Sequence, residues 1–391
     1  MTAHIRLIVI WLLAVIDTAV QAEVTLDGSF GVKGSIPLQQ NTYVIDSLAG
    51  KRVGGNLFHS FGRFNLETGS TARFTDSTQS AIARVIGRVT GGEPSSIDGT
   101  LQSTIPSADF YLINPAGILF GPNAKLDVPG VFHASTATVL TLADGSEFSA
   151  AGGSETLLGI AAPAAFGFLG SEGDIQLQGS QLTVANGLQM SASSTTLDAA
   201  RLSSYGGNIS INAVGDQAAI VPLQDAVPDL YGNITLTNSQ LISEASETLS
   251  GGIRLKGGDI TLSNALVRTL SQTATASGNI ELDASALVLD FGWIASTSFG
   301  VGNGGNLSLR VDSLEGGNGS SVYAATTGEG RSGDIMLRAT KNIDFEGVNG
   351  SVASGVFNKS FSTAAGDSGD VTIEAPVIGL RDGAHLEVST S

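Results

Sequence analysis

The segment Gly258-Asp259-Ile260-Thr261-Leu262 decides the fold that we expect for this chain. Its two apolar residues stand two positions apart, so in a β-strand both side chains point to the same face. Thr261 lies between them and points to solvent, while the preceding Gly-Asp pair tolerates the backbone that a sharp corner needs. The segment therefore predicts a corner followed by a short strand with one buried face.

The same pattern of a glycine, an Asp or Asn, and two apolar residues separated by one residue returns throughout the second half of the chain. The copies are Gly173–Leu177, Gly207–Ile211, Gly232–Leu236, Gly258–Leu262, Gly278–Leu282, Gly305–Leu309, Gly333–Leu337 and Gly369–Ile373. One such strand cannot bury its own apolar face, whereas stacked coils bury a continuous column of Ile, Leu and Val. We therefore predict a parallel β-helix in which positions such as Ile260/Leu262 and Ile280/Leu282 form one stacked column.

The spacing of these copies is irregular, because successive glycines are 34, 25, 26, 20, 27, 28 and 36 residues apart. Each coil is expected to rise by about 4.8 Å, so roughly ten coils would form a rod about 50 Å long. Asparagines at equivalent corners are expected to form a hydrogen-bonded ladder along it. An immunoglobulin-like array is the alternative, but each of its sandwiches needs about 100 residues, and no such larger period is visible.

The composition favours many short strands over long helices. Of 391 residues, 51 are glycine, 42% are hydrophobic and 14% are charged, so the chain packs a core. The net charge of −17 comes from scattered acidic residues without a basic cluster, so we expect no nucleic-acid partner. The chain has no cysteine and its histidines are scattered, so we expect no zinc site and no cofactor.

The N-terminus has the features of a secretory signal peptide at residues 1–22. Arg6 supplies the positive charge, Leu7 to Ile16 form a short apolar run, and Val20-Gln21-Ala22 provides a cleavage site. A transmembrane anchor is the alternative, but the run falls short of the roughly 20 residues that span a bilayer. We expect the mature chain to begin at Glu23.

Residues 23–165 are less repetitive and contain three distinctive segments. The first, Gly54–Leu66, includes Asn56, Phe58, His59 and Phe61. The second, Arg88–Gly99, includes Arg88, Thr90, Gly91, Pro94, Asp98 and Gly99. The third, Asp109–Thr136, contains Asn114-Pro115-Ala116-Gly117-Ile118. In this last motif the proline fixes φ, the asparagine side chain can bond its own backbone, and the glycine permits unusual geometry, so a tight turn is expected between two apolar strands.

Together the three motifs resemble the N-terminal secretion (haemagglutination activity) domain of filamentous-haemagglutinin-like exoproteins, the secreted partners of two-partner secretion systems. The resemblance covers residues 23–165, and Asn114, Pro115, Gly117 and Ile118 match the Asn-Pro-x-Gly-Ile motif of that family. It implies an all-β, right-handed parallel β-helix (a pectate-lyase-like solenoid) with an N-terminal cap and extra short strands. Two features depart from the family pattern: Phe74–Ser80 lacks an Asn-Pro pair, and Glu93 replaces a common Asn.

The resemblance also implies a route and a partner. A signal peptide (1–22) takes the chain to the periplasm, and the secretion domain (23–165) is captured by periplasmic domains of a cognate outer-membrane pore. The chain then folds outside, where residues 166–391 form the β-helix repeats. Asn114, Pro115, Gly117 and Ile118 are the expected transporter-recognition motif, and the alternative is a purely structural turn that serves folding and only indirectly secretion. We expect a secreted, extracellular or surface-bound monomer, with a host-cell or surface receptor as a further candidate partner.

Three functional classes follow from these patterns. A surface adhesin or biofilm component is the leading interpretation, and a polysaccharide-degrading β-helix enzyme or a haemolysin-type toxin are the alternatives. We expect no catalysis, because Gly328–Gly333 and Gly366–Asp370, which resemble a nucleotide-binding and a serine-protease motif, lie in repeat corners. The final residues, GLRDGAHLEVSTS, stop within the pattern, so we expect a fragment of a longer protein.

Overall fold

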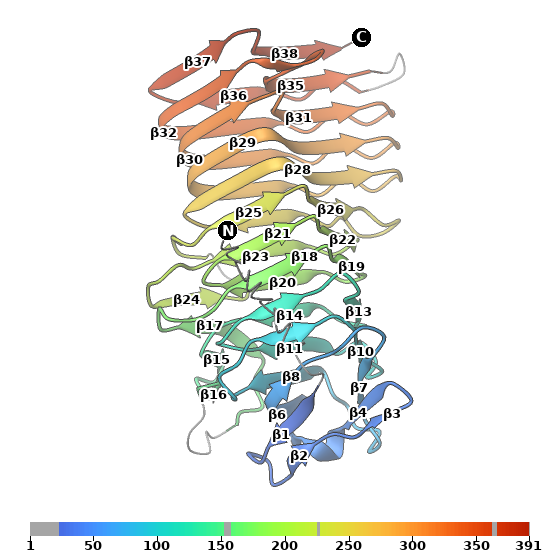
Figure 1. Ribbon diagram of the computed structural model, residues 1–391. Coiled ribbons are helices and arrows are strands. Elements are labelled where there is room, and N and C mark those ends of the chain that lie inside the picture. The colour runs from blue at the N-terminus through green and yellow to red at the C-terminus, as the bar shows by residue number, and fades with distance from the viewer. Residues whose placement is uncertain (1–22, 152–157, 225–226, 362–365, 391) are drawn as a thin grey trace, which may run out of the picture.

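A three-sided stack of coils makes up the computed structural model, which describes residues 23–151, 158–224, 227–361 and 366–390. The stack is a right-handed parallel β-helix, which runs from the blue N-terminal end to the red C-terminal end (Figure 1). The predicted signal peptide, residues 1–22, lies outside the described residues. Within the described ranges, no helix has the length and hydropathy of a membrane span. The all-β prediction is confirmed, with one 3-10 turn at Ser47–Ala49.

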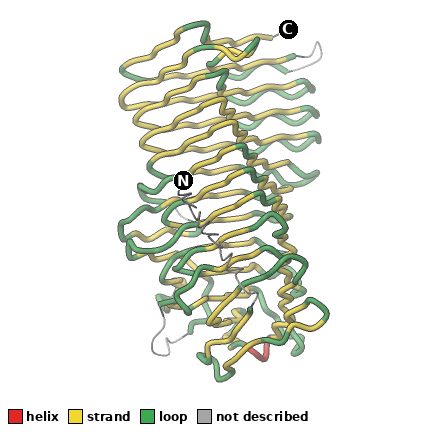
Figure 2. The backbone as a smooth tube through the Cα atoms, in the orientation of Figure 1, coloured by secondary structure: helices red, strands yellow, loops and turns green. Residues whose placement is uncertain are grey.

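Each coil contributes strands to three faces of the rod, and corner loops join the faces (Figure 2). Face 1 consists of β6 (Asn56–Phe64), β8 (Arg84–Val89), β11 (Asp109–Ile113), β14 (Phe132–Ser135), β20 (Leu188–Ala192), β23 (Ile209–Ala213), β27 (Ile253–Lys256), the first parts of β29 (Ile280–Ser298), β30 (Leu307–Gly317) and β32 (Ile335–Glu346), and β36 (Val371–Glu374).

Face 2 consists of β9 (Ser95–Ile97), β12 (Ile118–Phe120), β18 (Ile175–Gln178), β21 (Thr195–Asp198), β25 (Ile234–Thr237), the first part of β28 (Asp259–Ser271), later parts of β29, β30 and β32, and β37 (Val377–Arg381). Face 3 begins with β4 (Thr42–Asp46), β7 (Thr71–Thr75), β10 (Thr100–Ser103) and β13 (Lys125–Asp127). It continues with β19 (Gln181–Val184), β22 (Arg201–Tyr205), β26 (Gln240–Glu244), the ends of β28 and β29, β31 (Ser321–Thr326), β35 (Gly355–Ser360) and β38 (His385–Thr390).

Two groups of antiparallel strands pack against the β-helix near its N-terminal end. Antiparallel strands β1 (Val24–Asp27), β2 (Lys33–Ser35), β3 (Leu38–Gln39) and β5 (Lys51–Val53) cap the first coil. A separate antiparallel sheet of β16 (Glu147–Ser149), β15 (Val139–Leu142), β17 (Pro163–Phe168) and β24 (Ala219–Pro222) packs outside face 1. A small hairpin, β33 (Val348–Asn349) and β34 (Val352–Ala353), projects from the shaft.

The repeats that predicted the fold occupy two faces, not one. Ile260 lies on face 2, where it pairs with Ile234 and Leu287, whereas Ile280 lies on face 1, where it pairs with Ile253 and Leu307. The prediction of one stacked column is therefore wrong, although all these residues belong to the same core. The same five-residue pattern can form a corner followed by an inward-facing strand on either face, so it occurs at two different corners of the coil. This alternation explains the irregular spacing.

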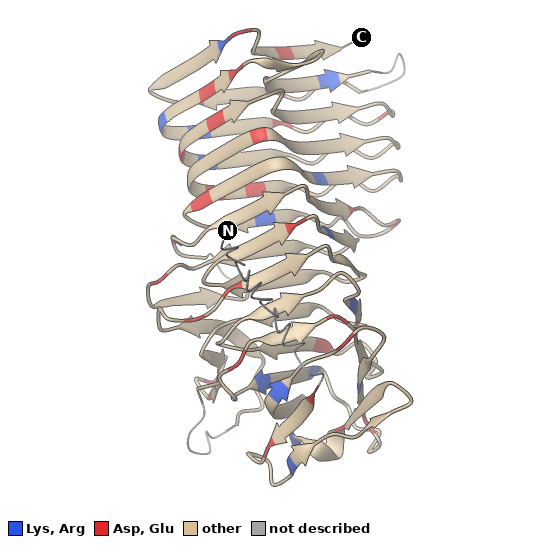
Figure 3. Ribbon diagram, in the orientation of Figure 1, with Lys and Arg blue, Asp and Glu red and all other residues tan. Residues whose placement is uncertain are grey.

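The corner ladder exists, but its bonds run from the backbone of one coil to a side chain of the preceding coil. The backbone N–H of Asn306 donates to Oδ1 of Asn279, that of Asp334 to Oδ1 of Asn306, and that of Asp370 to Oδ1 of Asp334, each at 2.9 Å. Acidic and basic residues are distributed along the whole rod (Figure 3). One hydrophobic core runs from Val24 to Val356 and is continuous across residue 165. The domain boundary at that residue stays a prediction.

Candidate functional site

The three sequence motifs lie on adjacent coils at the N-terminal end of face 1. β6, β8 and β11 are parallel neighbours, and Phe58, Ile86 and Tyr111 stand in one register. The fold therefore brings the motifs together, although they are separated in sequence. Their corners also stack, which makes the Asn-Pro turn the uppermost of the three.

Asn114 closes this turn from within the protein, with no exposed surface. Its Oδ1 accepts the backbone N–H of Ala116 at 3.0 Å, and its carbonyl accepts the N–H of Gly117 at 3.0 Å. Its Nδ2 donates to the carbonyl of Glu93 and to Oγ of Ser95, both at 3.0 Å, in the coil below. One side chain thus shapes its own turn and joins it to the preceding coil.

The rest of the turn is held from the coil above. The Pro115 carbonyl accepts the N–H of Gly173 at 2.7 Å, and the Ile118 N–H donates to the carbonyl of Asp174 at 3.0 Å. Gly117 has φ of 122°, a conformation that side chains with a Cβ rarely adopt. Pro115 is half-buried and Ile118 is buried. The motif is therefore an interior corner between two coils.

The corner below contains the second motif and is more open. Thr90 Oγ1 donates to Oδ2 of Asp27 at 2.9 Å, and Pro94 is exposed. A Cβ on Gly91 would lie 1.9 Å from the carbonyl oxygen of Gly62, so only glycine allows these backbones to approach so closely. Steric demand alone accounts for this glycine.

Arg88 is the centre of a buried polar network that ties the cap to the first coils. Its Nε donates to Oγ of Ser60 at 2.7 Å, its Nη1 donates to the carbonyl of Ser149, and its guanidinium lies 4.5 Å from the ring centroid of Phe148. Oγ of Ser60 in turn donates to Oδ2 of Asp27 at 2.6 Å. Burial lowers the pKa of Arg88, and the nearby Asp27 carboxylate opposes that effect.

Sequence reasoning missed Asp27 and Glu172, which both hold several donors. Burial acts to raise the pKa of Asp27, but bonds from Ser60, Thr90 and Ser29 outweigh it, so the pKa lies below the usual value. Glu172 likewise accepts Oγ1 of Thr138 and three consecutive backbone N–H groups. Both acids precede or follow ordinary turns, so no local pattern distinguishes them.

The remaining motif residues have packing or bonding roles. His59 is fully buried between Phe61 and Phe74, and neither ring nitrogen has a hydrogen-bond partner among the described residues. This burial lowers its pKa to about 4. Asn56 donates to the carbonyls of Gly159 and Ala161, at 3.2 and 2.7 Å.

Two further motif residues stabilise the loop on the opposite side of the coil. Asp98 accepts Oγ1 of Thr68 and the N–H of Asn123, and these bonds lower its pKa against the opposing effect of burial. A Cβ on Gly99 would lie 2.4 Å from the carbonyl oxygen of Ser70. Phe58 packs under the extra sheet, 5.0 Å from Phe148 between ring centroids. All these contacts hold coils together.

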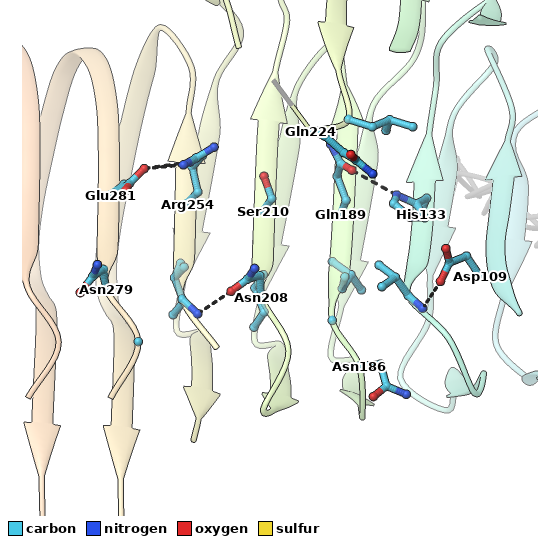
Figure 4. Close-up of a pocket in the computed structure, with 18 of the residues that line it drawn as sticks. Asp109, His133, Asn186, Gln189, Asn208, Ser210, Gln224, Arg254, Asn279 and Glu281 are labelled. Carbon is cyan, nitrogen blue, oxygen red and sulfur yellow. Dashed lines mark hydrogen bonds and ion pairs between the residues drawn. The ribbon is translucent and has the colours of Figure 1, made fainter. Parts of the chain in front are cut away.

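A polar groove of about 720 Å³ runs along face 1 beside these motifs (Figure 4). Its floor follows one register: Tyr111, His133, Gln189, Ser210, Arg254 and Glu281. Nδ1 of His133 lies 3.1 Å from Oε1 of Gln189, and burial lowers the pKa of this histidine to about 4. Arg254 and Glu281 form an ion pair at 2.7 Å. Asp109, the third charged residue of the lining, accepts the backbone N–H of Val131 at 2.9 Å. The groove therefore does not present an unbonded acid beside an unbonded base.

Among the described residues, no group of three or more histidine or acidic side chains is placed to hold a metal ion. A family model described as a TPS secretion domain matches residues 22–288. The chain belongs to the TPS secretion domain family. A TPS chain is exported to the extracellular space through a dedicated outer-membrane transporter, its partner in two-partner secretion. The match extends beyond the motifs into the regular part of the rod.

The comparison with solved structures agrees with the fold. The crystal structure of the HMW1 secretion domain from Haemophilus influenzae is similar, with a TM-score of 0.51 and 16% sequence identity. The alignment covers 88% of this chain and 96% of that chain. At this identity the likeness shows the right-handed β-helix alone. No curated protein sequence matches this TPS chain significantly.

Proposed function

We propose that residues 23–165 of this TPS chain act as its secretion signal and folding nucleus, and that the repeats form a stiff shaft of a surface adhesin or biofilm component. The observation that carries the first part is the burial of Asn114 between two coils. A pore that reads this side chain must do so before the corner forms. The alternative for the motif is that its contribution to export is purely through folding.

The contacts of Asn114 favour an early role in folding. Its bonds to Glu93 and Ser95 join two successive coils, and the turn then receives the N–H of Gly173 from the next coil. A coil that has just crossed the membrane gains these bonds only when the coil before it is already in place. Formation of this corner therefore sets the register on which later coils stack, which makes the N-terminal domain a nucleus.

The adhesin or biofilm role is supported by the form of the outward-facing surface. β-helix enzymes gather acid and base groups on neighbouring coils of one cleft, whereas the groove on face 1 pairs Arg254 with Glu281 and holds a neutral His133. A long rod with such a surface suits display and attachment. A non-catalytic role therefore explains the arrangement with fewer assumptions than an enzyme or a toxin.

The experiment is an export assay in a strain that carries the cognate pore. The double change Asn114→Ala/Pro115→Ala should leave the periplasmic amount normal and reduce the surface amount severalfold, since the turn loses its φ restraint and its side-chain bonds. Pro106→Ala/Ser107→Ala is the matched control, because it alters an exposed proline-containing turn just before β11.

A second variant separates recognition from folding. Asn114→Asp keeps an oxygen for the Ala116 N–H but loses both donors to the lower coil. Normal refolding in vitro together with failed export would indicate recognition by the pore, and slow refolding with failed export would indicate folding. Wild-type export of the double variant would show that the motif serves neither purpose. The adhesin role is tested by comparing how many cells attach to a surface when they export the protein and when they do not.

A further inference from the structure

A small pocket of about 240 Å³ opens on face 3 of the shaft. Leu266 and Arg268 of its lining lie within the residues that the TPS family model matches, and the other lining residues follow that range. Its floor is Ala295, which stands in register between Arg268 on the coil below and Tyr323 on the coil above. Both neighbours have long side chains, so the alanine leaves a notch in the outward-facing column. The volume lies below the roughly 300–1,000 Å³ of sites for drug-sized ligands, so it suits a single ring.

Aromatic side chains form the walls of this notch. Trp293 and Tyr323 border it from the strands, while Phe299 and Phe361, each 50% exposed, stand at its rim. Trp293 is the only tryptophan in residues 23–391, and its Nε1 donates to the carbonyl of Gly319 at 3.1 Å, which fixes the indole. Fixed aromatic faces around a small gap offer flat apolar surfaces with little loss of side-chain entropy on binding.

Arg268 is the exceptional cation of the shaft. Nine Lys and Arg residues follow Gly252, and among the described residues eight of them form ion pairs while Arg268 forms none. Its Nε donates to Oγ1 of Thr297 at 3.0 Å, and its guanidinium lies 5.4 Å from the ring centroid of Phe299. The nearby Glu244 accepts a bond from Gln272 instead. The outer guanidinium nitrogens of Arg268 are therefore available to an anion.

We propose that this notch binds an acidic sugar residue of the uronic-acid type. Its ring would lie against the aromatic walls over Ala295, and its carboxylate would accept two bonds from the planar Arg268 fork. A neutral sugar lacks the anion, and an inorganic anion lacks a face to stack. This inference concerns the shaft and does not depend on how the Asn-Pro motif serves export.

The test is a titration of the purified chain that begins at Glu23, followed by the fluorescence of Trp293. D-glucuronic acid should change the emission, and D-glucose should bind at least about tenfold more weakly, since a hydrogen bond to a charged group contributes about 1.5–3 kcal/mol. Arg268→Met should weaken glucuronate by a similar factor. Ala295→Leu should abolish the response by filling the notch, while Arg310→Met, which removes an exposed and paired arginine, should not alter it.

Each other result would overturn the proposal. No change in Trp293 emission at millimolar glucuronate would mean that the notch is empty space. Equal binding of glucose would exclude the carboxylate–arginine contact. Equal binding of benzoate would show that the pocket binds any ring that carries a carboxylate and is not selective for a sugar. A thermal melt of each variant shows whether a lost response reflects unfolding.

Discussion

The first coils and the shaft solve the same stacking problem in different ways. The early coils pack aromatic side chains one upon another: Phe61, Phe64, Phe74, Phe110 and Phe132 follow in sequence, with neighbouring ring centroids 4.7–6.2 Å apart. The shaft instead repeats Ile and Leu pairs, such as Ile253, Ile280 and Leu307 in one column. The β-helix thus begins with a unique set of aromatic contacts and continues with repeated aliphatic contacts.

The polar contacts differ in the same sense. In the early coils they are unique and buried, as for Asn114 and Arg88, and each joins partners of different kinds. In the shaft the same bond recurs from Asn279 to Asp370 on the outside of a corner. Unique buried bonds specify one register, whereas a repeated bond fits any adjacent pair of coils. The early coils therefore define the register that the shaft extends.

The largest expected effect is a charge placed in the shaft core. Ile260→Asp buries an unpaired carboxylate at a position with no exposed surface, and we expect it to cost about 4 kcal/mol or more of unfolding free energy. Thr261→Asp, on the outer side of the same strand, should cost less than about 1 kcal/mol. Urea unfolding measures both, and equal losses would contradict the facing of this strand.

The same variant also tests whether the early coils and the shaft unfold separately. Stacked repeats contact only their neighbours, so the damage from Ile260→Asp should be confined to the coils around β28. Hydrogen exchange should show lost protection there and unchanged protection in β6, β8 and β11. Equal loss of protection along the whole rod would mean that the early coils and the shaft unfold as a single unit.

Acid should weaken the early coils first, because they hold the buried histidines His59 and His133. In each, burial lowers the pKa from 6.5 to about 4 in the folded chain, so the unfolded chain binds a proton at higher pH than the folded chain. Their contribution to stability is complete above pH 6.5 and falls as the pH drops toward 4. At pH 5 the loss is about 2 kcal/mol for each histidine.

Urea unfolding at pH 7 and at pH 5 measures this effect. His59→Leu keeps an apolar side chain between Phe61 and Phe74, so it should remove about half of the pH dependence. His385, which is exposed at the end of the shaft, is the control position, and His385→Gln should leave the dependence unchanged. A pH dependence that survives loss of both buried histidines would place its origin elsewhere.

The smallest expected effect distinguishes one asparagine of each region. Asn306→Ala removes a single exposed bond to the Asp334 N–H and should cost about 0.5–1.5 kcal/mol. Asn114→Ala leaves three partners without their bonds inside the protein, so it should cost about 2 kcal/mol or more. Similar losses in urea unfolding would show that the unique and the repeated bonds are energetically equivalent.

Much of the fold follows from local sequence. The two-residue spacing in segments such as Gly258–Leu262 determines which side chains face inward, and the preceding Gly-Asx pair determines the corner. The Asn-Pro turn at Asn114 is equally local, since the proline and the side-chain bond to Ala116 act within four residues. These features depend on neighbours along the chain, so they can be predicted from the local sequence.

Which residues become neighbours in the stack depends on how the coils are aligned in the folded protein. Regular coils of the shaft begin on face 1 at Ile253, Ile280, Leu307 and Ile335, but the excursion through β24 separates Ile209 from Ile253 by 44 residues. Such insertions change the spacing without changing the local pattern, so sequence could not assign a repeat to face 1 or face 2. For the same reason it could not show Asn114 beneath the next coil, Asp27 beside Ser60, or Ala295 between Arg268 and Tyr323. These contacts depend on register across coils, which is fixed only when the whole stack forms.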